Sequence, residues 1–147
     1  MFALARLSLG KEITQPTKAM LAQKQTLLIG SALGLLAVLL GAFGAHALKD
    51  ILSAHGRVET YELAVRYHFY HSLAMLAVGL LMDKFPYSIL KLSALLLFIG
   101  ALLFSGSLYL LSLLNVSAIA IVTPFGGLFL MAGWSTLFMA VLRNVKN

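Results

Sequence analysis

The chain of 147 residues contains no cysteine, which excludes both a disulfide framework and a thiolate metal site. Charged side chains are scarce: Asp, Glu, Lys and Arg make up only 11% of the residues, against about a quarter in typical soluble domains. The 11 basic residues form no stripe interleaved with aromatic side chains, so the net charge of +6 does not indicate a nucleic-acid partner. These absences argue against an ordinary soluble domain and against a nucleic-acid-binding protein.

What the chain has in excess is apolar surface. Hydrophobic residues account for 61% of the sequence, and the mean hydropathy is +0.94. This composition is typical of an integral membrane protein, whose apolar side chains face the lipid bilayer. In such a chain the basic residues flank the membrane spans and set their orientation.

Apolar segments long enough to cross a bilayer predict an all-α, four-helix transmembrane bundle. The helices are expected near 26–48, 57–82, 88–114 and 117–142. The second helix begins with an amphipathic turn that carries Glu62 and Arg66 at an i,i+4 spacing. No charged residue occurs over 92–142, a length that suits two helices joined near Asn115. Pro124 lies inside the fourth helix and removes a backbone hydrogen bond, so we expect a kink near it.

The start of the chain differs in composition from the rest. Residues 1–24 are mixed, polar and weakly patterned, and we expect them to form a flexible N-terminal extension. Residues 25–147 then form a single four-span membrane domain. Both Met1 and Met20 are candidate translation starts.

The distribution of basic residues predicts the orientation. Four spans place both termini on the same side as the loop between the second and third helices. That side carries eight basic residues, Arg6, Lys11, Lys18, Lys24, Lys84, Lys91, Arg143 and Lys146. The other side carries Lys49, Arg57 and Arg66. The positive-inside rule predicts a multi-pass protein of the cell (inner) membrane with both termini cytoplasmic.

Small residues repeat along one face of the first predicted helix. At about 100° per residue, this face carries Gly30, Gly34, Ala37, Gly41 and Gly44. Such a groove lets a neighbouring backbone approach closely where lipid offers no hydrophobic driving force. We predict that this glycine stripe packs within the bundle, and a homo-oligomer or membrane-protein partner is the alternative. We find no internal repeat in the sequence.

The last two predicted helices carry further candidates for helix packing. Gly106 lies between two serines that can bond back to their own helix or across to a neighbour. Gly126 and Gly127 follow Pro124 and let another helix approach the bend. Trp134 lies too deep for an interfacial residue, so we expect it in a helix interface, where its indole N–H needs an acceptor.

Polar side chains gather where the first helix ends and the second begins. The candidate polar site comprises His46, Tyr61, Glu62, Arg66, Tyr67, Tyr70 and His71. Our main interpretation is a hydrogen-bonded interfacial cluster in which Glu62 neutralises Arg66. Ionisable groups buried within a span would instead mark a functional site.

The histidines of this interval also allow a metal or haem interpretation. His68 and His71 share a helix face at an i,i+3 spacing, and His46 can approach them from the first helix. Imidazoles held on two helices suit a transition metal or a haem. Two histidines at this spacing alone are a weak signal without a third ligand, and we expect no metal and no cofactor.

Four motifs occur in order along the chain: "GAFGAHAL", "YELAVRYHFYHSLAMLAVGLL", "SGSLYLLSL" and "TPFGGLFLMAGW". Together, over residues 26–142, they resemble the YgdD/YwdK-like family of small four-helix membrane proteins, a family of unknown function with bacterial and eukaryotic members. The resemblance implies a multi-pass inner-membrane or plasma-membrane protein and brings no established activity. It adds Gly133 to the candidate packing residues. The family pattern carries glutamine where this chain has His68, which argues against a metal site there.

No nucleophile triad, phosphate-binding loop or carboxylate pair is present, so we expect no enzyme. Our leading hypothesis is a non-enzymatic membrane protein whose polar cluster contacts a partner, a lipid headgroup or a small ligand. The alternative is a small transporter or channel. In that case His46, Glu62, Arg66 and His71 line a path, and Pro124 marks the bend.

Overall fold

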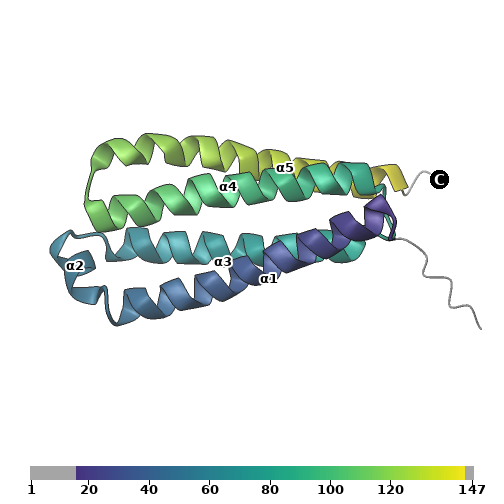
Figure 1. Ribbon diagram of the computed structural model, residues 1–147. Helices are drawn as coiled ribbons and strands as arrows, with labels where there is room; N and C mark the ends of the chain where they lie inside the picture. The colour runs from purple at the N-terminus through teal and green to yellow at the C-terminus, as the bar shows by residue number, and fades with distance from the viewer. Residues whose placement is uncertain (1–15, 145–147) are drawn as a thin grey trace, which may run out of the picture.

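The computed structural model describes residues 16–144, and within that range the chain is helical and contains no strand (Figure 1). Its elements are α1 (Lys18–Ala45), α2 (Lys49–Ala54), α3 (Val58–Leu81), α4 (Tyr87–Leu114), the 3-10 helix η1 (Ser117–Ile121) and α5 (Val122–Asn144). The all-α prediction is confirmed. The predicted count of four helices is not, because α2 is an additional short helix and the predicted fourth helix is divided into η1 and α5.

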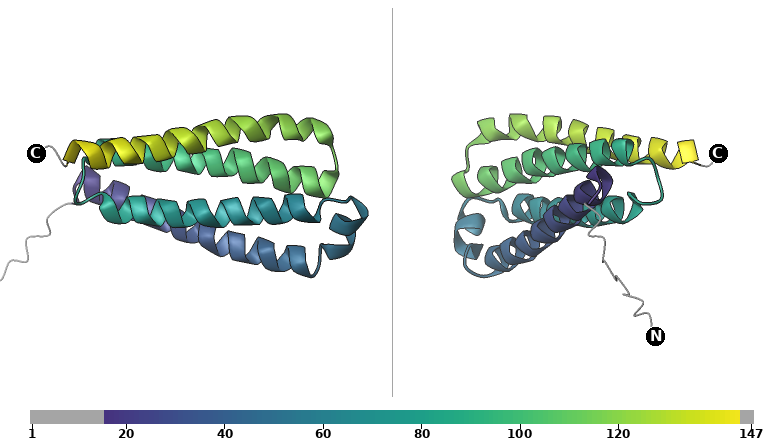
Figure 2. Two further views of the ribbon diagram at one scale, coloured as in Figure 1. Left: turned by 180° about the vertical axis from the view of Figure 1, so that it is seen from behind. Right: turned by 45° about the vertical axis from the view of Figure 1, so that its right-hand side comes forward.

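The four long helices alternate in direction and lie side by side in the order α1, α3, α4 and α5 (Figures 1 and 2). One end of the molecule holds the start of α1, the α3–α4 connection and the end of α5, and we call it the termini end. The opposite end, the α2 end, holds α2 and the connection from α4 to α5. The main apolar core includes Met75, Val78, Leu90 and Leu97, at the interfaces that α3 and α4 make.

The first helix begins earlier than predicted. α1 starts at Lys18, so residues 18–24, which we assigned to a flexible extension, are helical, whereas residues 1–15 lie outside the described range. The Thr17 hydroxyl caps this start by accepting a hydrogen bond from the Met20 N–H at 3.2 Å. At its other end α1 stops at Ala45, before the predicted residue 48, because the chain turns into α2.

Pro124 lies in the first turn of α5, which begins at Val122. A backbone N–H in the first turn has no partner within the helix. The prolyl nitrogen therefore costs α5 no hydrogen bond. In place of one helix over 117–142 the structure has η1 and α5, whose junction lies two residues before Pro124, near the predicted kink; the bend itself stays a prediction.

The glycine stripe of α1 lies against α3. Each predicted glycine has one α3 side chain over it, in antiparallel order: Leu76 on Gly30, Ser72 on Gly34, Val65 on Gly41 and Tyr61 on Gly44. Ala37, in the middle of the stripe, is fully buried. A Cβ atom added at Gly41 would lie 3.2 Å from the nearest Val65 carbon, which is tighter than ordinary packing. The stripe is thus covered by another helix of the same chain.

Near the termini end the contact between α1 and α3 is reciprocal. Leu76 of α3 lies over Gly30 of α1, and Leu27 of α1 lies over Gly79 of α3. A Cβ atom added at Gly79 would lie 2.8 Å from Leu27 Cδ2. Each helix therefore contributes a Leu-x-x-Gly segment, and the two antiparallel segments exchange leucine for glycine. We call this exchange a Leu-Gly clasp.

A second Leu-Gly clasp joins α4 and α5. Leu130 lies over Gly100, and Leu97 lies over Gly133, with added Cβ atoms 2.6 and 2.8 Å from the respective leucine Cδ2 atoms. The four segments read LLIG, LAVG, LFIG and LMAG, one in each long helix. The hairpins α1–α3 and α4–α5 thus repeat the same contact, although no repeat is apparent in the sequence. Only two positions per helix are shared, which is too little for a sequence comparison to detect.

The remaining predicted packing glycines behave differently from one another. A Cβ atom added at Gly126 would overlap the backbone of Phe104, whereas one at Gly127 would lie 3.9 Å from the Phe104 ring, an ordinary contact. Gly106 has no atom within 4 Å of an added Cβ, so no helix packs against it. Only Gly126 of these three marks a close helix approach.

Among the described residues, three helices are long and apolar enough to span a membrane: α1, most of α4, and the continuous segment Ser117–Arg143. α3 does not qualify by composition, because its first half carries Glu59, Glu62 and Arg66 together with histidine and tyrosine side chains. It lies between α1 and α4.

Candidate functional site

The predicted polar site does not form one cluster. It divides into exposed His46 at the end of α1, a groove lined in part by Tyr61, Glu62 and Arg66, and a second group, Tyr67, Tyr70 and His71, that faces α5. Residues that follow one another on α3 thus meet different neighbours.

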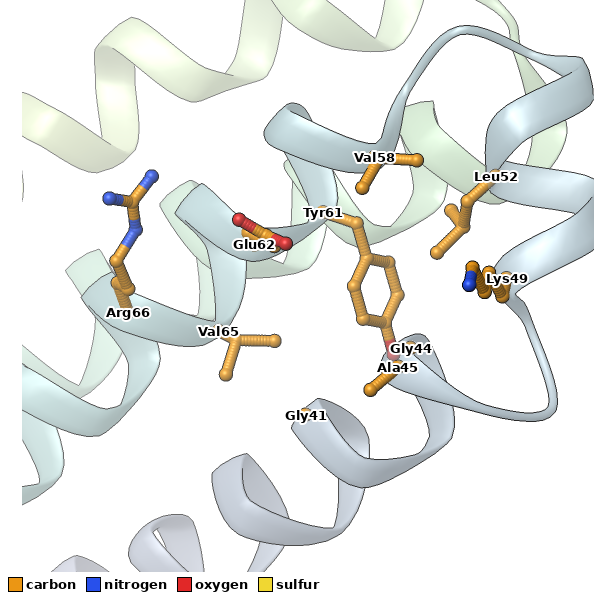
Figure 3. Close-up of a pocket in the computed structure, with 10 residues that line it drawn as sticks. All are labelled: Gly41, Gly44, Ala45, Lys49, Leu52, Val58, Tyr61, Glu62, Val65 and Arg66. Carbon is orange, nitrogen blue, oxygen red and sulfur yellow. The ribbon is translucent and has the colours of Figure 1, made fainter.

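The groove lies at the α2 end, between the last turn of α1, α2 and the first turns of α3, and encloses about 510 Å³ (Figure 3). We call it the α2-end groove. It is lined by Gly41, Gly44, Ala45, Lys49, Leu52, Val58, Tyr61, Glu62, Val65 and Arg66. Tyr61 points from α3 towards Gly44, and Lys49 lies on the α2 side of the groove.

Tyr61 forms the wall between this groove and the interior of the bundle. Its hydroxyl donates to the Leu40 carbonyl oxygen at 2.9 Å, and its ring packs edge-on against Tyr109 of α4 at 5.1 Å. The absence of a side chain on Gly44 is what admits the ring, because a Cβ atom there would overlap it. The last two glycines of the stripe, Gly41 and Gly44, therefore lie in the α1–α3 interface and also line the groove.

Charge is concentrated along the edge of the groove. Lys49 and Arg66 contribute two cations and Glu62 one carboxylate, while the rest of the lining other than Tyr61 is apolar. No ion pair joins any of these three side chains to another described residue, and Arg66 and Glu62 point apart in Figure 3. The predicted neutralisation of Arg66 by Glu62 is therefore not formed. The groove has a surplus of one positive charge over an apolar floor.

Hydrogen bonds to the end of α4 hold the α2 end together. His55 Nδ1 lies 3.0 Å from the Ser112 carbonyl oxygen, and Arg57 Nε donates to Asn115 Oδ1 at 3.2 Å. Gly56, between these residues, has a φ of +64°, a left-handed conformation that glycine adopts at low cost after a helix. These contacts fix the turn that carries α2 over the groove.

The second polar group joins α3 to α5 through His71 and Trp134. His71 Nδ1 lies 2.7 Å from the Tyr67 carbonyl oxygen, which can only accept, so Nδ1 carries the proton. The Trp134 indole N–H donates to His71 Nε2 at 3.3 Å, so Nε2 is unprotonated. His71 is thus a neutral imidazole with both nitrogens occupied, and the acceptor required by Trp134 is found.

The arrangement of the histidines bears on metal binding. His71 has no free ring nitrogen, and within residues 16–144 no group of three His, Cys, Asp or Glu side chains is placed to hold a metal ion. The aromatic ring of Tyr67 stacks on Phe104 of α4 at 4.5 Å, which extends this group to a third helix. This second polar group therefore connects α3 to both α4 and α5.

Three apolar helices of spanning length in the described, all-helical part of the chain define an integral membrane protein. The family model described as protein of unknown function (DUF423) matches residues 40–127. The chain belongs to this family, which confirms the resemblance given by the four motifs.

Relatives match most of the chain. It is 36% identical over 121 residues to the UPF0382 membrane protein YwdK of Bacillus subtilis (strain 168), covering 82% of this chain and 98% of the relative. It is 35% identical over 119 residues to the UPF0382 inner membrane protein YgdD of Escherichia coli (strain K12), covering 80% and 88%. A UPF0382 membrane protein of Staphylococcus epidermidis (strain ATCC 12228 / FDA PCI 1200) is 38% identical over 120 residues, covering 82% and 97%. No solved structure matches the chain.

Sequence reasoning missed Lys49 and Leu52 as lining residues of the groove. Both lie on α2, which was not predicted because a helix of six residues carries too little periodicity. The sequence feature that could have indicated a lining residue was the charge of Lys49, directly after the "GAFGAHAL" motif.

Proposed function

We propose that this chain is a non-enzymatic, four-span protein of the cell (inner) membrane whose α2-end groove binds the headgroup of an anionic phospholipid. The observation that carries the proposal is the pair of cations, Lys49 and Arg66, that have no ion-pair partner among residues 16–144 and lie at the edge of a groove with an apolar floor. The printed name of the Escherichia coli relative, an inner membrane protein, supports the location.

The position of α3 supports a fourth span. Its 24 residues correspond to about 36 Å, more than the thickness of the hydrocarbon core. It runs antiparallel between two apolar helices of spanning length, and its polar side chains His68, His71 and Ser72 are buried against them or α5. A helix enclosed in this way crosses the bilayer with its neighbours even though its own composition is polar.

Four spans put the α2 end on one side of the membrane and the termini end on the other. The termini end carries Lys18, Lys24, Lys84, Lys91 and Arg143 among the described residues, and the α2 end carries Lys49 and Arg57, with Arg66 about two turns into α3. The positive-inside rule then favours cytoplasmic termini. The groove opens on the non-cytoplasmic side.

The groove suits a phospholipid because its two parts match the two parts of such a molecule. Lys49 and Arg66 offer a phosphate charge-assisted hydrogen bonds, and each basic group near an anionic surface contributes about 1 kcal/mol. The apolar lining formed by Val65, Gly41 and Ala45 suits the glycerol and upper acyl region. Glu62 at the same edge disfavours a second negative charge.

The test is lipid retention by the full chain purified in mild detergent and read by native mass spectrometry. Phosphatidylglycerol should be retained in preference to phosphatidylcholine, and Lys49→Gln and Arg66→Gln should each lower its apparent affinity about fivefold, corresponding to about 1 kcal/mol. Glu62→Gln should raise it. Phosphatidylglycerol recovered with unchanged mass supports the non-enzymatic part of the proposal.

The matched control is Lys24→Gln, which removes one exposed cation at the termini end. Its retention should equal that of the unmodified chain. Equal retention of both lipids, or a loss in Lys24→Gln as large as in Arg66→Gln, would show that only net charge matters and that the groove is not the site.

The transport alternative has less support. It needs His46, Glu62, Arg66 and His71 on one path, but these residues lie in three separate places along α1 and α3. Pro124, the expected bend, lies in the first turn of α5.

A further inference from the structure

A second groove lies on the outer surface between α3 and α5 and encloses about 670 Å³. We call it the α3–α5 groove. Part of its exposed surface is polar, no charged side chain lines it, and it shares no lining residue with the α2-end groove. Tyr70 and Trp134, which line it, are 58% and 48% exposed, so the groove is open to the surrounding lipid.

The groove lies near the middle of the membrane. Trp134 directly follows Gly133, the central residue of α5, and α5 belongs to a helical segment of spanning length. Tyr70 lies at the centre of α3. At this depth no water is available to hydrogen-bond a polar side chain, so each polar group needs a partner in the protein or in a ligand.

Two hydroxyl groups of this groove, those of Tyr67 and Tyr70, have no hydrogen-bond partner among residues 16–144. Both can be reached from outside. Tyr70 is an exposed residue, and the enclosed side-chain atoms without a partner in the described chain belong to His68 and Ser105, so the Tyr67 hydroxyl is not enclosed. The groove therefore presents two free phenol donors to whatever occupies it.

The other polar groups of the groove are already satisfied. The Trp134 indole N–H donates to His71 Nε2, and His71 Nδ1 donates to the Tyr67 carbonyl oxygen. The Ser135 hydroxyl donates to the Met131 carbonyl oxygen at 2.8 Å. The unmet requirement is thus for a hydrogen-bond acceptor near Tyr67 and Tyr70.

Aromatic rings supply much of the remaining lining. Trp134 stands on α5, and Tyr67 and Tyr70 stand on α3, with the Tyr67 ring held by stacking on Phe104 at 4.5 Å. Indole and phenol rings have electron-rich faces, which stack favourably on an electron-poor planar ring. The lining thus matches a flat, uncharged ring better than a flexible acyl chain.

We propose that the α3–α5 groove binds the headgroup of a lipid quinone, an uncharged, electron-poor ring whose carbonyl oxygens accept hydrogen bonds from Tyr67 and Tyr70. A phospholipid acyl chain carries no such acceptor at this depth. The volume is ample for a substituted ring, since an apolar cavity of about 150 Å³ holds benzene. The apolar tail leaves past Met131, which is 60% exposed.

The single tryptophan of the chain makes the test direct. The full chain in phosphatidylcholine vesicles is titrated with decylubiquinone, because quinones quench tryptophan fluorescence. We expect a saturable loss of Trp134 intensity with an unchanged excited-state lifetime, the mark of a bound quencher. Tryptophan octyl ester in the same vesicles measures collisional quenching in lipid, which shortens the lifetime and does not saturate.

Removal of either free hydroxyl should weaken binding without a loss of stability. Tyr67→Phe and Tyr70→Phe should each lower the affinity about fivefold and keep the unfolding midpoint, because neither hydroxyl has a partner in the described chain. The matched control is Tyr109→Phe, whose hydroxyl lies 3.3 Å from His68 Nδ1 and outside the groove. It should lower the midpoint and leave the affinity unchanged.

A second pair of variants tests the space in the groove. Ser135→Leu places a larger side chain in the lining and should lower the affinity at least tenfold. Ala132→Leu adds a similar side chain at an exposed position of α5 outside the lining and should have no effect. Decylbenzene, which has a ring and tail but no carbonyl group, should not displace the quinone.

Three results would overturn the proposal. Quenching no different from that of the tryptophan ester would show that lipid alone fills the groove. Quenching weaker than that of the ester would show that another protein surface, such as a second copy, covers Trp134. Equal affinity in both tyrosine variants, or displacement by decylbenzene, would show that the hydroxyls hold no carbonyl group.

This inference is independent of the ligand proposed for the α2-end groove. The vesicles contain no anionic lipid, and the α3–α5 groove has no charged lining residue. Absence of quinone binding therefore leaves the phospholipid proposal standing, and unselective retention of phosphatidylglycerol leaves this one standing.

Discussion

Gly126 and Gly127 are adjacent in the sequence, yet their backbones meet different surroundings. An added Cβ at Gly126 overlaps the Phe104 backbone, which cannot move without shifting α4, while Gly127 has only an ordinary contact with the Phe104 ring. Gly126→Ala should therefore destabilise the protein by about 1–3 kcal/mol through overpacking. Gly127→Ala should be neutral or stabilising by up to about 1 kcal/mol, because alanine favours the helix.

Unfolding in a sodium dodecyl sulfate titration, followed by circular dichroism, measures both variants against the unmodified chain. Equal loss of stability in the two variants would mean that the close approach of α4 and α5 at Gly126 is incorrect.

His71 and Trp134 form a second test at the residue scale. Because Trp134 donates to His71 Nε2, the two side chains should be energetically coupled, and hydrogen bonds between membrane helices contribute about 0.6–1.7 kcal/mol. His71→Phe and Trp134→Phe should each destabilise the protein, and the double variant should lose less than their sum by about 1 kcal/mol. His46→Ala should stay within about 0.5 kcal/mol of the unmodified chain, since His46 is exposed.

The same titration completes this double-mutant cycle. Additive losses would show that the two side chains do not interact. A large loss in His46→Ala would show that the end of α1 depends on that histidine.

At the scale of elements, both Leu-Gly clasps should be sensitive to an added methyl group. Gly79 and Gly133 face leucines at the same added-Cβ distance, 2.8 Å, one in each hairpin. Gly79→Ala and Gly133→Ala should each destabilise the protein by about 1–3 kcal/mol, with the larger loss at Gly133, because the Leu97 backbone nitrogen lies 3.0 Å from the added Cβ there, whereas the Leu27 nitrogen lies 3.5 Å from the one at Gly79. Gly106→Ala, which adds the same methyl group to open space, serves as the control and should not destabilise. If Gly79→Ala or Gly133→Ala were as stable as Gly106→Ala, the clasp in that hairpin would be contradicted.

Some features of the helices could be predicted from the sequence, and others could not. The glycine stripe was predictable, since a helical period of small residues specifies a face, and α3 lies on that face. The polar site was not, because spacing along α3 says which residues share a face but not which helix each one meets. His71 meets Trp134 from a distant segment, while Arg66, only a short way along α3, lines the groove. The start of α1 was placed too late because residues 18–24 share the mixed, polar and weakly patterned composition of the segment before them.

At the scale of the whole molecule, the fourth span can be tested with the cysteine-free chain as its own background. Ser53, on α2, and Ser88, at the start of α4, are both exposed and lie at opposite ends of the bundle. In intact cells a membrane-impermeant maleimide should label Ser53→Cys, whereas Ser88→Cys should react only after permeabilisation. Labelling of both positions from the same side would mean that α3 does not cross the membrane. Reversed labelling would leave the four spans and overturn cytoplasmic termini.

The order in which the clasps form along the chain bears on biogenesis. α3 is not among the described helices that are apolar enough to span a membrane by composition, whereas its clasp partner α1 is, and α1 leaves the ribosome first. Both clasps join helices that are consecutive among the four long ones, so α3 can enter the bilayer folded against α1 before α4 has been made. The second hairpin can then follow in the same manner. With α3 as the proposed fourth span, we propose that the unit of insertion is the helical hairpin, in which the clasp holds the polar helix against an apolar one.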